Sequence, residues 1–142
     1  MLKGFFIIIV SFITLLSSCQ KLPPEAQFIE QNKITGVIAV DGKIKDKCSG
    51  FLFIIVRNME SPQPFAVKRI KNPDYPYKFT ISPADVIIIE DNFKLFQGDL
   101  LIYAKTSKSG NPFEEGGYCE SEVKTVKAGS RNIKIILDNY KE

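Results

Sequence analysis

The stretch Leu100-Leu101-Ile102-Tyr103-Ala104-Lys105-Thr106-Ser107-Lys108-Ser109-Gly110-Asn111-Pro112 decides how this chain folds. Residues 100–105 have the apolar pattern of a buried strand. The strand then meets Ser-Gly-Asn-Pro, where Gly and Asn tolerate a positive φ and Pro cannot donate to a sheet ladder. The stretch therefore predicts a strand that runs directly into a surface turn.

Patterns of the same kind recur on both sides of this strand. We expect strands at residues 34–40, 50–57, 65–70, 77–81, 99–106, 120–126 and 133–137. Residues 86–89 form a short apolar run that fits either a strand or a helical turn. About seven short strands, with turn signals every eight to twelve residues, indicate an Ig-like antiparallel β-sandwich. We expect one such domain, over residues 34–142.

Residues 1–18 have the features of an export signal. Lys3 supplies a positive charge, and residues 5–16 form an apolar run that is short for a membrane span. Leu16-Ser17-Ser18-Cys19 resembles a bacterial lipobox, in which Cys19 is lipidated and becomes the new N-terminus. The alternative is an ordinary secretory signal with an incidental cysteine. Gln20 in place of Asp favours the outer membrane, by resemblance to the lipoprotein sorting rule, with the protein facing the periplasm.

Residues 19–33 are expected to be the lipidated cysteine and a flexible tether. They contain Pro23-Pro24 and a polar run at residues 30–33. A short amphipathic turn around residues 26–29 is compatible with the sequence, but nothing requires it. Fully extended, the roughly fifteen residues from 19 to 34 would reach about 50 Å from a membrane surface.

The composition excludes several classes of function. The 142 residues carry a formal net charge of +3, or +2 without residues 1–18, which is too small to indicate nucleic-acid binding. There is no histidine. Its absence excludes a Ser-His-Asp or Cys-His nucleophile pair, a His-ligated zinc or haem, and a haem-attachment Cys-x-x-Cys-His motif. We expect no cofactor.

No group of residues indicates an enzyme. The carboxylates near strand ends are scattered and typical of solvated loops; they are Asp85, Glu90, Asp91 and Asp99. No calcium-loop spacing is present. Aromatic residues in or beside loops are better candidates for a partner-binding patch; they are Tyr75, Tyr77, Phe113 and Tyr118.

Cys48 and Cys119 remain once Cys19 is assigned to lipid. An even pair in an exported protein is most simply a disulfide. It would close a loop of about seventy residues and contribute about 4 kcal/mol in the chain-entropy model. Two free buried thiols and a redox-active pair are the alternatives, although the spacing is not Cys-x-x-Cys and no local base is evident.

Three stretches, in this order and spacing, resemble one known family. They are Pro62-Gln63-Pro64-Phe65-Ala66-Val67-Lys68-Arg69, Tyr75-Pro76-Tyr77-Lys78-Phe79-Thr80-Ile81 and Ala104-Lys105-Thr106-Ser107-Lys108-Ser109-Gly110-Asn111-Pro112. The family is the C-terminal, Ig-like periplasmic domain of the cytochrome c biogenesis factor CcmI, also called CycH. Its parent proteins carry transmembrane helices and a tetratricopeptide region ahead of this domain, where the present sequence has a lipobox and a tether. The chain also departs from the family pattern at Gly116-Gly117-Tyr118-Cys119-Glu120.

The resemblance implies a non-catalytic, membrane-anchored accessory of cytochrome c maturation. Such a protein would bind apocytochrome c or a subunit of the haem-ligation machinery through two loops. The candidate residues are Pro62, Gln63, Pro64, Phe65, Ser107, Lys108, Ser109, Gly110, Asn111 and Pro112. These loops are also what a sandwich needs merely to reverse the chain. A generic envelope lipoprotein that binds another protein or a polymer, and a small redox factor, are the other classes of function.

Overall fold

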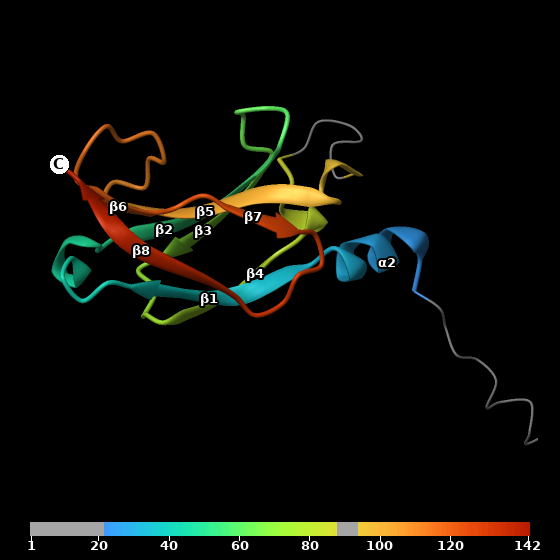
Figure 1. Ribbon diagram of the computed structural model, residues 1–142, viewed down its shortest axis with the longest axis horizontal. Coiled ribbons are helices and arrows are strands. Elements are labelled where there is room, and N and C mark those ends of the chain that lie inside the picture. Colours follow the sequence, from blue (N-terminus) through green and yellow to red (C-terminus); the bar gives the residue numbers. More distant parts are fainter. Residues whose placement is uncertain (1–21, 88–93) are drawn as a thin grey trace, which may run out of the picture.

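The computed structural model describes residues 22–87 and 94–142, and these form one mostly-β domain (Figure 1). Their helices include the α-helix α2 (Pro24–Gln31) and the short 3-10 helices η1 (Lys45–Lys47) and η2 (Pro83–Asp85). The strands are β1 (Ile34–Val40), β2 (Phe51–Asn58), β3 (Ala66–Lys71), β4 (Tyr77–Ile81), β5 (Asp99–Ser107), β6 (Tyr118–Ser121), β7 (Lys124–Lys127) and β8 (Ile133–Lys141). Met1 to Lys21, which include Cys19, lie outside the described residues, as do residues 88–93 with Glu90 and Asp91.

The strands form one sheet that folds over on itself into two layers. Its order is β3-β2-β5-β6-β8-β1-β4, and β7 pairs beside β5. Strands β2, β3, β5 and β7 form one layer, whereas β1, β4 and β8 lie in the other (Figure 1). The two outermost strands are joined by a side chain, because Lys68 Nζ on β3 donates to the Thr80 carbonyl on β4 at 2.7 Å. The sheet is therefore nearly closed, like a flattened barrel.

One strand pair departs from the expected antiparallel arrangement. β1 and β8 run parallel, whereas every other pair among the described strands is antiparallel. Gly36 makes this pairing possible, since a β-carbon at that position would lie 2.0 Å from the Ile133 carbonyl oxygen. The sheet is thus mixed, and the first and last strands of the domain are direct neighbours.

The core lies between the two layers. In β5, alternate residues are fully buried, as the period of two requires. The fully buried apolar side chains of the central strands are Leu52, Ile54, Val56, Leu100, Ile102, Ala104, Ile135 and Leu137. Because they come from both layers, the two layers share a single apolar core.

The strand expected at residues 120–126 is two strands. β6 pairs with β5 and β8, whereas β7 pairs with β5 alone. The break lies at Ser121, whose hydroxyl accepts the Ala104 backbone N–H at 2.9 Å and so replaces a ladder bond. The register also shifts between Glu120 and Ser121. The chain therefore changes partner strand here, and the described residues contain eight strands where about seven were expected.

Part of the expected tether is an ordered helix. α2 has Pro24 in its first turn, where the missing N–H is tolerated, and Glu25 beside the positive end of the helix dipole. The C-terminal end of α2 meets the turn between β7 and β8, because a β-carbon on Gly129 would lie 2.5 Å from the Gln31 carbonyl oxygen. The helix thus leads directly into β1 at one end of the domain (Figure 1).

The structure describes the first two residues of the apolar run 86–89. Val86 is buried and forms an isolated antiparallel bridge with Ala66 of β3. Ile87 is exposed, and its N–H donates to the Phe65 carbonyl at 2.7 Å. Ile88 and Ile89 lie outside the described residues.

Candidate functional site

The face of β2, β3 and β5 that points away from the core carries an apolar row of its own. Val67, Ile55 and Tyr103 are direct neighbours in register on β3, β2 and β5. Ile55 is only 4% exposed, although it does not belong to the core between the layers. Other parts of the chain therefore rise around Ile55, and it forms the floor of a depression.

One wall of this depression is the β5–β6 loop, residues 108–117. The loop bends back over the outer face, since Gly110 lies against the Phe51 ring and the Arg69 guanidinium. That guanidinium also lies 4.2 Å from the centroid of the Phe51 ring. Beneath the loop, Lys105 Nζ donates to the Glu114 carbonyl at 3.4 Å and sits 3.9 Å from the centroid of the Tyr118 ring.

Hydrogen bonds between residues close in sequence fix the shape of the β5–β6 loop. Ser107 Oγ accepts the Gly110 N–H at 3.0 Å, and Asn111 Oδ1 accepts the Phe113 N–H at 3.0 Å. The carboxylate of Glu114 accepts from both the backbone N–H and the hydroxyl of Ser109, and these bonds lower the pKa of Glu114. The polar side chains of the Ser-Lys-Ser-Gly-Asn stretch thus hold the loop, and they bring Phe113 to its rim.

The floor and the loop enclose a hollow of about 400 Å³, which we call the apolar hollow. It is lined by Ile55, Pro64, Val67, Tyr103, Lys105, Pro112, Phe113 and Glu120. The ring of Phe113 is 80% exposed, which is unusual for so large an apolar side chain. Pro64 contributes to the lining from the β2–β3 loop and Pro112 from the β5–β6 loop.

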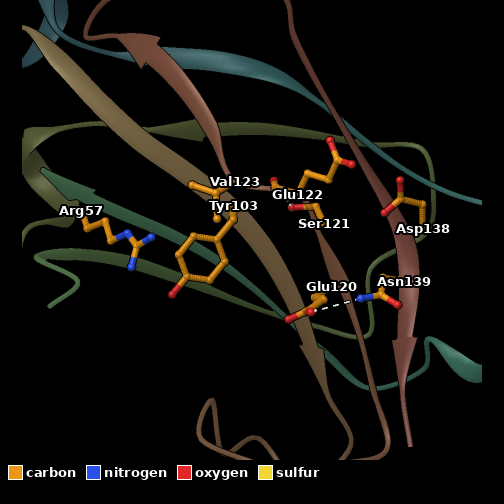
Figure 2. Close-up of a pocket in the computed structure, with 8 residues that line it drawn as sticks. All are labelled: Arg57, Tyr103, Glu120, Ser121, Glu122, Val123, Asp138 and Asn139. Atoms are coloured by element: carbon orange, nitrogen blue, oxygen red, sulfur yellow. Dashed lines mark hydrogen bonds between the residues drawn. The ribbon is translucent and has the colours of Figure 1, made fainter. Parts of the chain in front are cut away.

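A second hollow, of about 550 Å³, continues the depression across β5, β6 and β8, and we call it the acidic hollow (Figure 2). It is lined by Arg57, Tyr103, Glu120, Ser121, Glu122, Val123, Asp138 and Asn139. Glu120 accepts from Asn139 Nδ2 at 3.3 Å and lies 3.7 Å from Lys141 Nζ. Because Tyr103 and Glu120 line both hollows, the two form one continuous surface, which we call the groove.

Tyr103 and Arg57 form the middle of the groove. In Figure 2, the Tyr103 ring lies between Arg57 and Glu120, and the guanidinium carbon of Arg57 is 5.9 Å from the ring centroid. Burial raises the pKa of Tyr103, Arg57 lowers it and Glu120 raises it, so the phenol is neutral at physiological pH. The Arg57 Nε is buried without a hydrogen-bond partner among the described residues.

The two predicted loops start from opposite ends of the β2–β5 pair but meet at the groove. Asn58, where β2 ends, pairs with Leu100, whereas Ser107 lies at the other end of β5. Pro64 and Pro112 nevertheless line the same apolar hollow. The structure therefore brings together one residue from each loop, across the outer face of the sheet.

The other predicted residues lie in different environments. Pro62, Gln63, Lys108, Ser109 and Asn111 are exposed. Ser107 is buried, and its hydroxyl oxygen accepts the Gly110 N–H within the β5–β6 loop. Phe65 is only 8% exposed and packs edge-to-face on Phe96 with ring centroids 6.0 Å apart, so its side chain belongs to the core.

Residues of the groove floor were not singled out from the sequence. Ile55 stands in a strand that is apolar on both faces, which predicted a central strand. Only the register of β2 against β3 and β5 shows that Ile55, Val67 and Tyr103 form one row. Of the aromatic candidates in loops, Phe113 is at the groove, whereas Tyr75 and Tyr77 pack against the core.

Cys48 and Cys119 are joined by a disulfide with a Cα–Cα distance of 5.4 Å. It links the segment that follows η1 to β6, across 71 positions of sequence. Both residues are buried, at 4% and 0% exposure. A buried bond between distant segments fits a structural disulfide better than a redox pair, which needs an accessible thiolate.

No group of histidine, cysteine, aspartate or glutamate side chains within residues 22–87 and 94–142 could hold a metal ion. In the same described residues, no helix has the length and apolar character needed to cross a membrane.

The folded sheet and its disulfide define a mostly-β domain of the extracytoplasmic kind, since disulfides persist in oxidising compartments. The chain belongs to the family of the cytochrome c-type biogenesis protein H Ig-like domain, whose model matches residues 34–138. Membership links the chain to cytochrome c biogenesis. The chain is also 33% identical over 144 residues to an uncharacterised protein of Aquifex aeolicus (strain VF5), covering 90% of this chain and 91% of that protein. No solved structure matches significantly.

Proposed function

We propose that this chain is a non-catalytic accessory of cytochrome c maturation that binds apocytochrome c or a subunit of the haem-ligation machinery through the groove. One observation carries the proposal. Pro64 and Pro112, from two of the stretches that resemble the CcmI/CycH family, line the same apolar hollow. Reversal of the chain alone does not require these two stretches to share one hollow on the outer face of the sheet.

The surface chemistry of the groove supports a protein partner. Its rim carries an exposed aromatic ring, Phe113, and its floor carries a buried aliphatic side chain, Ile55. Aromatic anchors beside a desolvated apolar floor are typical of the residues that dominate protein–protein affinity. The polar side chains around the hollow would fix the orientation of the bound segment.

We also propose that Cys19 is lipidated and that the protein is held at the periplasmic face of a membrane, with the outer membrane favoured. The lipobox Leu16-Ser17-Ser18-Cys19 and Gln20 support this proposal. α2 lies at the end of the domain from which the chain leads toward Cys19 (Figure 1). The groove lies on a face of the sheet, so such an anchor would leave it accessible to partners from the side.

The test is capture from membranes of the native host, with the full-length lipidated chain as bait. Quantitative mass spectrometry would compare the wild type with Phe113→Ala, Lys108→Ala and Asn111→Ala. Leu95→Ala is the matched control, because Leu95 is also an exposed apolar residue, at 44%, but precedes the opposite end of β5. Cys19→Ala tests the anchor separately.

We expect haem-ligation subunits or apocytochrome c in the wild-type and Leu95→Ala samples. Their recovery should fall about tenfold with Phe113→Ala, since a lost aromatic anchor costs about 1.4 kcal/mol or more. Recovery of unrelated envelope proteins alone would refute the link to cytochrome maturation and favour a generic envelope lipoprotein. Equal recovery with Phe113→Ala and Leu95→Ala would refute the groove as the binding surface.

A further inference from the structure

The two halves of the groove differ in chemistry. The apolar hollow is lined mainly by aliphatic, proline and aromatic side chains, with Lys105 turned onto the Tyr118 ring. The acidic hollow holds one cation, Arg57, against three carboxylates: Glu120, Glu122 and Asp138. This excess of negative charge is local, because the whole chain has a formal net charge of +3. A ligand that spans the groove therefore meets an apolar surface at one end and a negative one at the other.

Two of the carboxylates are available to a ligand. Glu120 is engaged by Asn139 and Lys141. In contrast, Glu122 and Asp138 are exposed, and neither forms an ion pair with any residue of the described segments. Figure 2 shows their carboxylates on the same side of the hollow, away from Arg57. Positive charge placed between them would be attracted by both.

Arg57 adds a separate requirement. Its Nε is buried and has no acceptor among the described residues. A buried donor without an acceptor is destabilising, and such groups in native proteins call for an explanation. A rotation of the Arg57 side chain that turns Nε toward the groove would let a main-chain carbonyl beside Tyr103 supply the missing acceptor. The donor therefore favours a polypeptide over a ligand that lacks acceptors.

We propose that the groove binds an extended polypeptide segment with an apolar side chain in the apolar hollow and a lysine or arginine between Glu122 and Asp138. On binding, the Arg57 side chain rotates so that its Nε donates to a main-chain carbonyl of the segment. This inference rests on the proposed function, because the segment belongs to the partner protein. It adds which types of residue that segment carries.

The strand spacing sets the distance between the two side chains. The groove crosses β2, β5, β6 and β8, and three interstrand steps of about 4.8 Å span about 14 Å. An extended chain advances about 3.3 Å per residue. The basic residue should therefore follow or precede the apolar one by about four positions.

The test uses fluorescein-labelled twelve-residue peptides of serine and glycine that carry one Phe and one Arg at separations of one to seven positions. Fluorescence anisotropy would report their binding to the purified full chain in detergent micelles. Matched peptides replace Arg with Glu. The protein variants are the double change Glu122→Gln/Asp138→Asn and its control Glu25→Gln/Glu60→Gln, which removes the same charge from exposed positions outside the groove.

We expect the Arg peptide with a separation of about four to bind at least tenfold more tightly than its Glu counterpart at low salt. The preference should shrink at 0.5 M salt, because screening weakens exposed charge pairs. It should disappear in Glu122→Gln/Asp138→Asn and persist in the control. Equal affinities of the Arg and Glu peptides, a preference that survives Glu122→Gln/Asp138→Asn, or no binding of any peptide at millimolar concentration would overturn the inference. Capture of partners from membranes would be unaffected by that failure, so the two proposals fail separately.

Discussion

Gly110 lies so close to Phe51 that a β-carbon on it would come within 3.1 Å of the Phe51 ring. Glycine at this position therefore lets the β5–β6 loop lie on the outer face of the sheet without displacing that ring. The φ of Gly110, +86°, imposes the same choice through the backbone. One residue thus fixes both the path of the loop and the wall of the apolar hollow.

Gly110→Ala should lower the free energy of unfolding by about 2 kcal/mol, because a strained backbone and a steric contact add. Urea denaturation would measure it. Gly117→Ala is the matched control, since Gly117 has a φ of +76° in the same loop but nothing within 4 Å of the place where the added methyl group would lie. It should lose only the backbone contribution, about 1 kcal/mol. Equal losses in the two variants would show that the contact with Phe51 has no energetic weight.

Removal of the disulfide should be costly. Replacing both Cys48 and Cys119 with Ala is expected to lower the free energy of unfolding by about 4 kcal/mol, since the bond constrains a long loop of the unfolded chain. The melting temperature should fall by more than about 10 °C. The wild type in strong reductant should match the double variant. A melting temperature that is indifferent to reductant would contradict the structural role.

The contact of β5 with β6 should depend on one hydroxyl. Thr106 Oγ1 is buried and accepts the Cys119 backbone N–H at 2.8 Å. Thr106→Val would leave that N–H without an acceptor, at a cost of about 1–3 kcal/mol in urea denaturation. Thr106→Ser keeps the oxygen and should lose less. The exposed Thr125 provides the control, because Thr125→Val should change stability by less than about 0.5 kcal/mol.

Tyr75→Phe should stabilise the protein. The Tyr75 hydroxyl is buried without a hydrogen-bond partner among the described residues, so its removal should raise the free energy of unfolding by about 1 kcal/mol. Tyr77→Phe, on β4, is the control that should show no such gain. A loss of stability in Tyr75→Phe would mean that the hydroxyl is satisfied in solution.

Tyr75 should also make the stability of the protein depend on pH in the alkaline range. Burial raises the pKa of Tyr75 to about 12 from its ordinary value near 10. The folded protein holds this proton more tightly than the unfolded chain does. The free energy of unfolding is therefore unaffected by this group below pH 10 and falls as the pH rises from 10 toward 12. The stability difference between Tyr75→Phe and the wild type should therefore widen from pH 8 to pH 11. A constant difference across that range would contradict the raised pKa.

The sequence predicted most strands because their side chains alternate, and alternation does not depend on neighbours. The bounds 34–40 and 77–81 coincide with β1 and β4. Strand direction could not be predicted in this way, because the period of two is the same in parallel and antiparallel pairs. The parallel pairing of β1 with β8 is therefore known only from the structure. The split into β6 and β7 depends on a hydrogen bond between Ser121 and Ala104, which are distant in sequence.

The groove was predictable in part. Pro64 and Pro112 were named from the resemblance, and Phe113 from being an aromatic residue in a loop. The floor was not predictable. Ile55 lies in a strand that is apolar on both faces, and that sequence pattern is the same whether a second layer or a loop covers the side chain. Phe65 could not be distinguished from its neighbours Pro62 and Gln63 without the fold, since only its contact with Phe96 places it inside.

The parallel pairing of β1 with β8 also decides how the domain responds to force. β1 begins at the end where α2 lies, and β8 ends at the opposite end (Figure 1). Traction between those two ends pulls the strands past each other along their length. All the hydrogen bonds between them are then loaded at once, in shear, whereas a hairpin pulled from one end opens bond by bond. We therefore expect the first and last strands to resist extension more strongly than a hairpin pulled from one end.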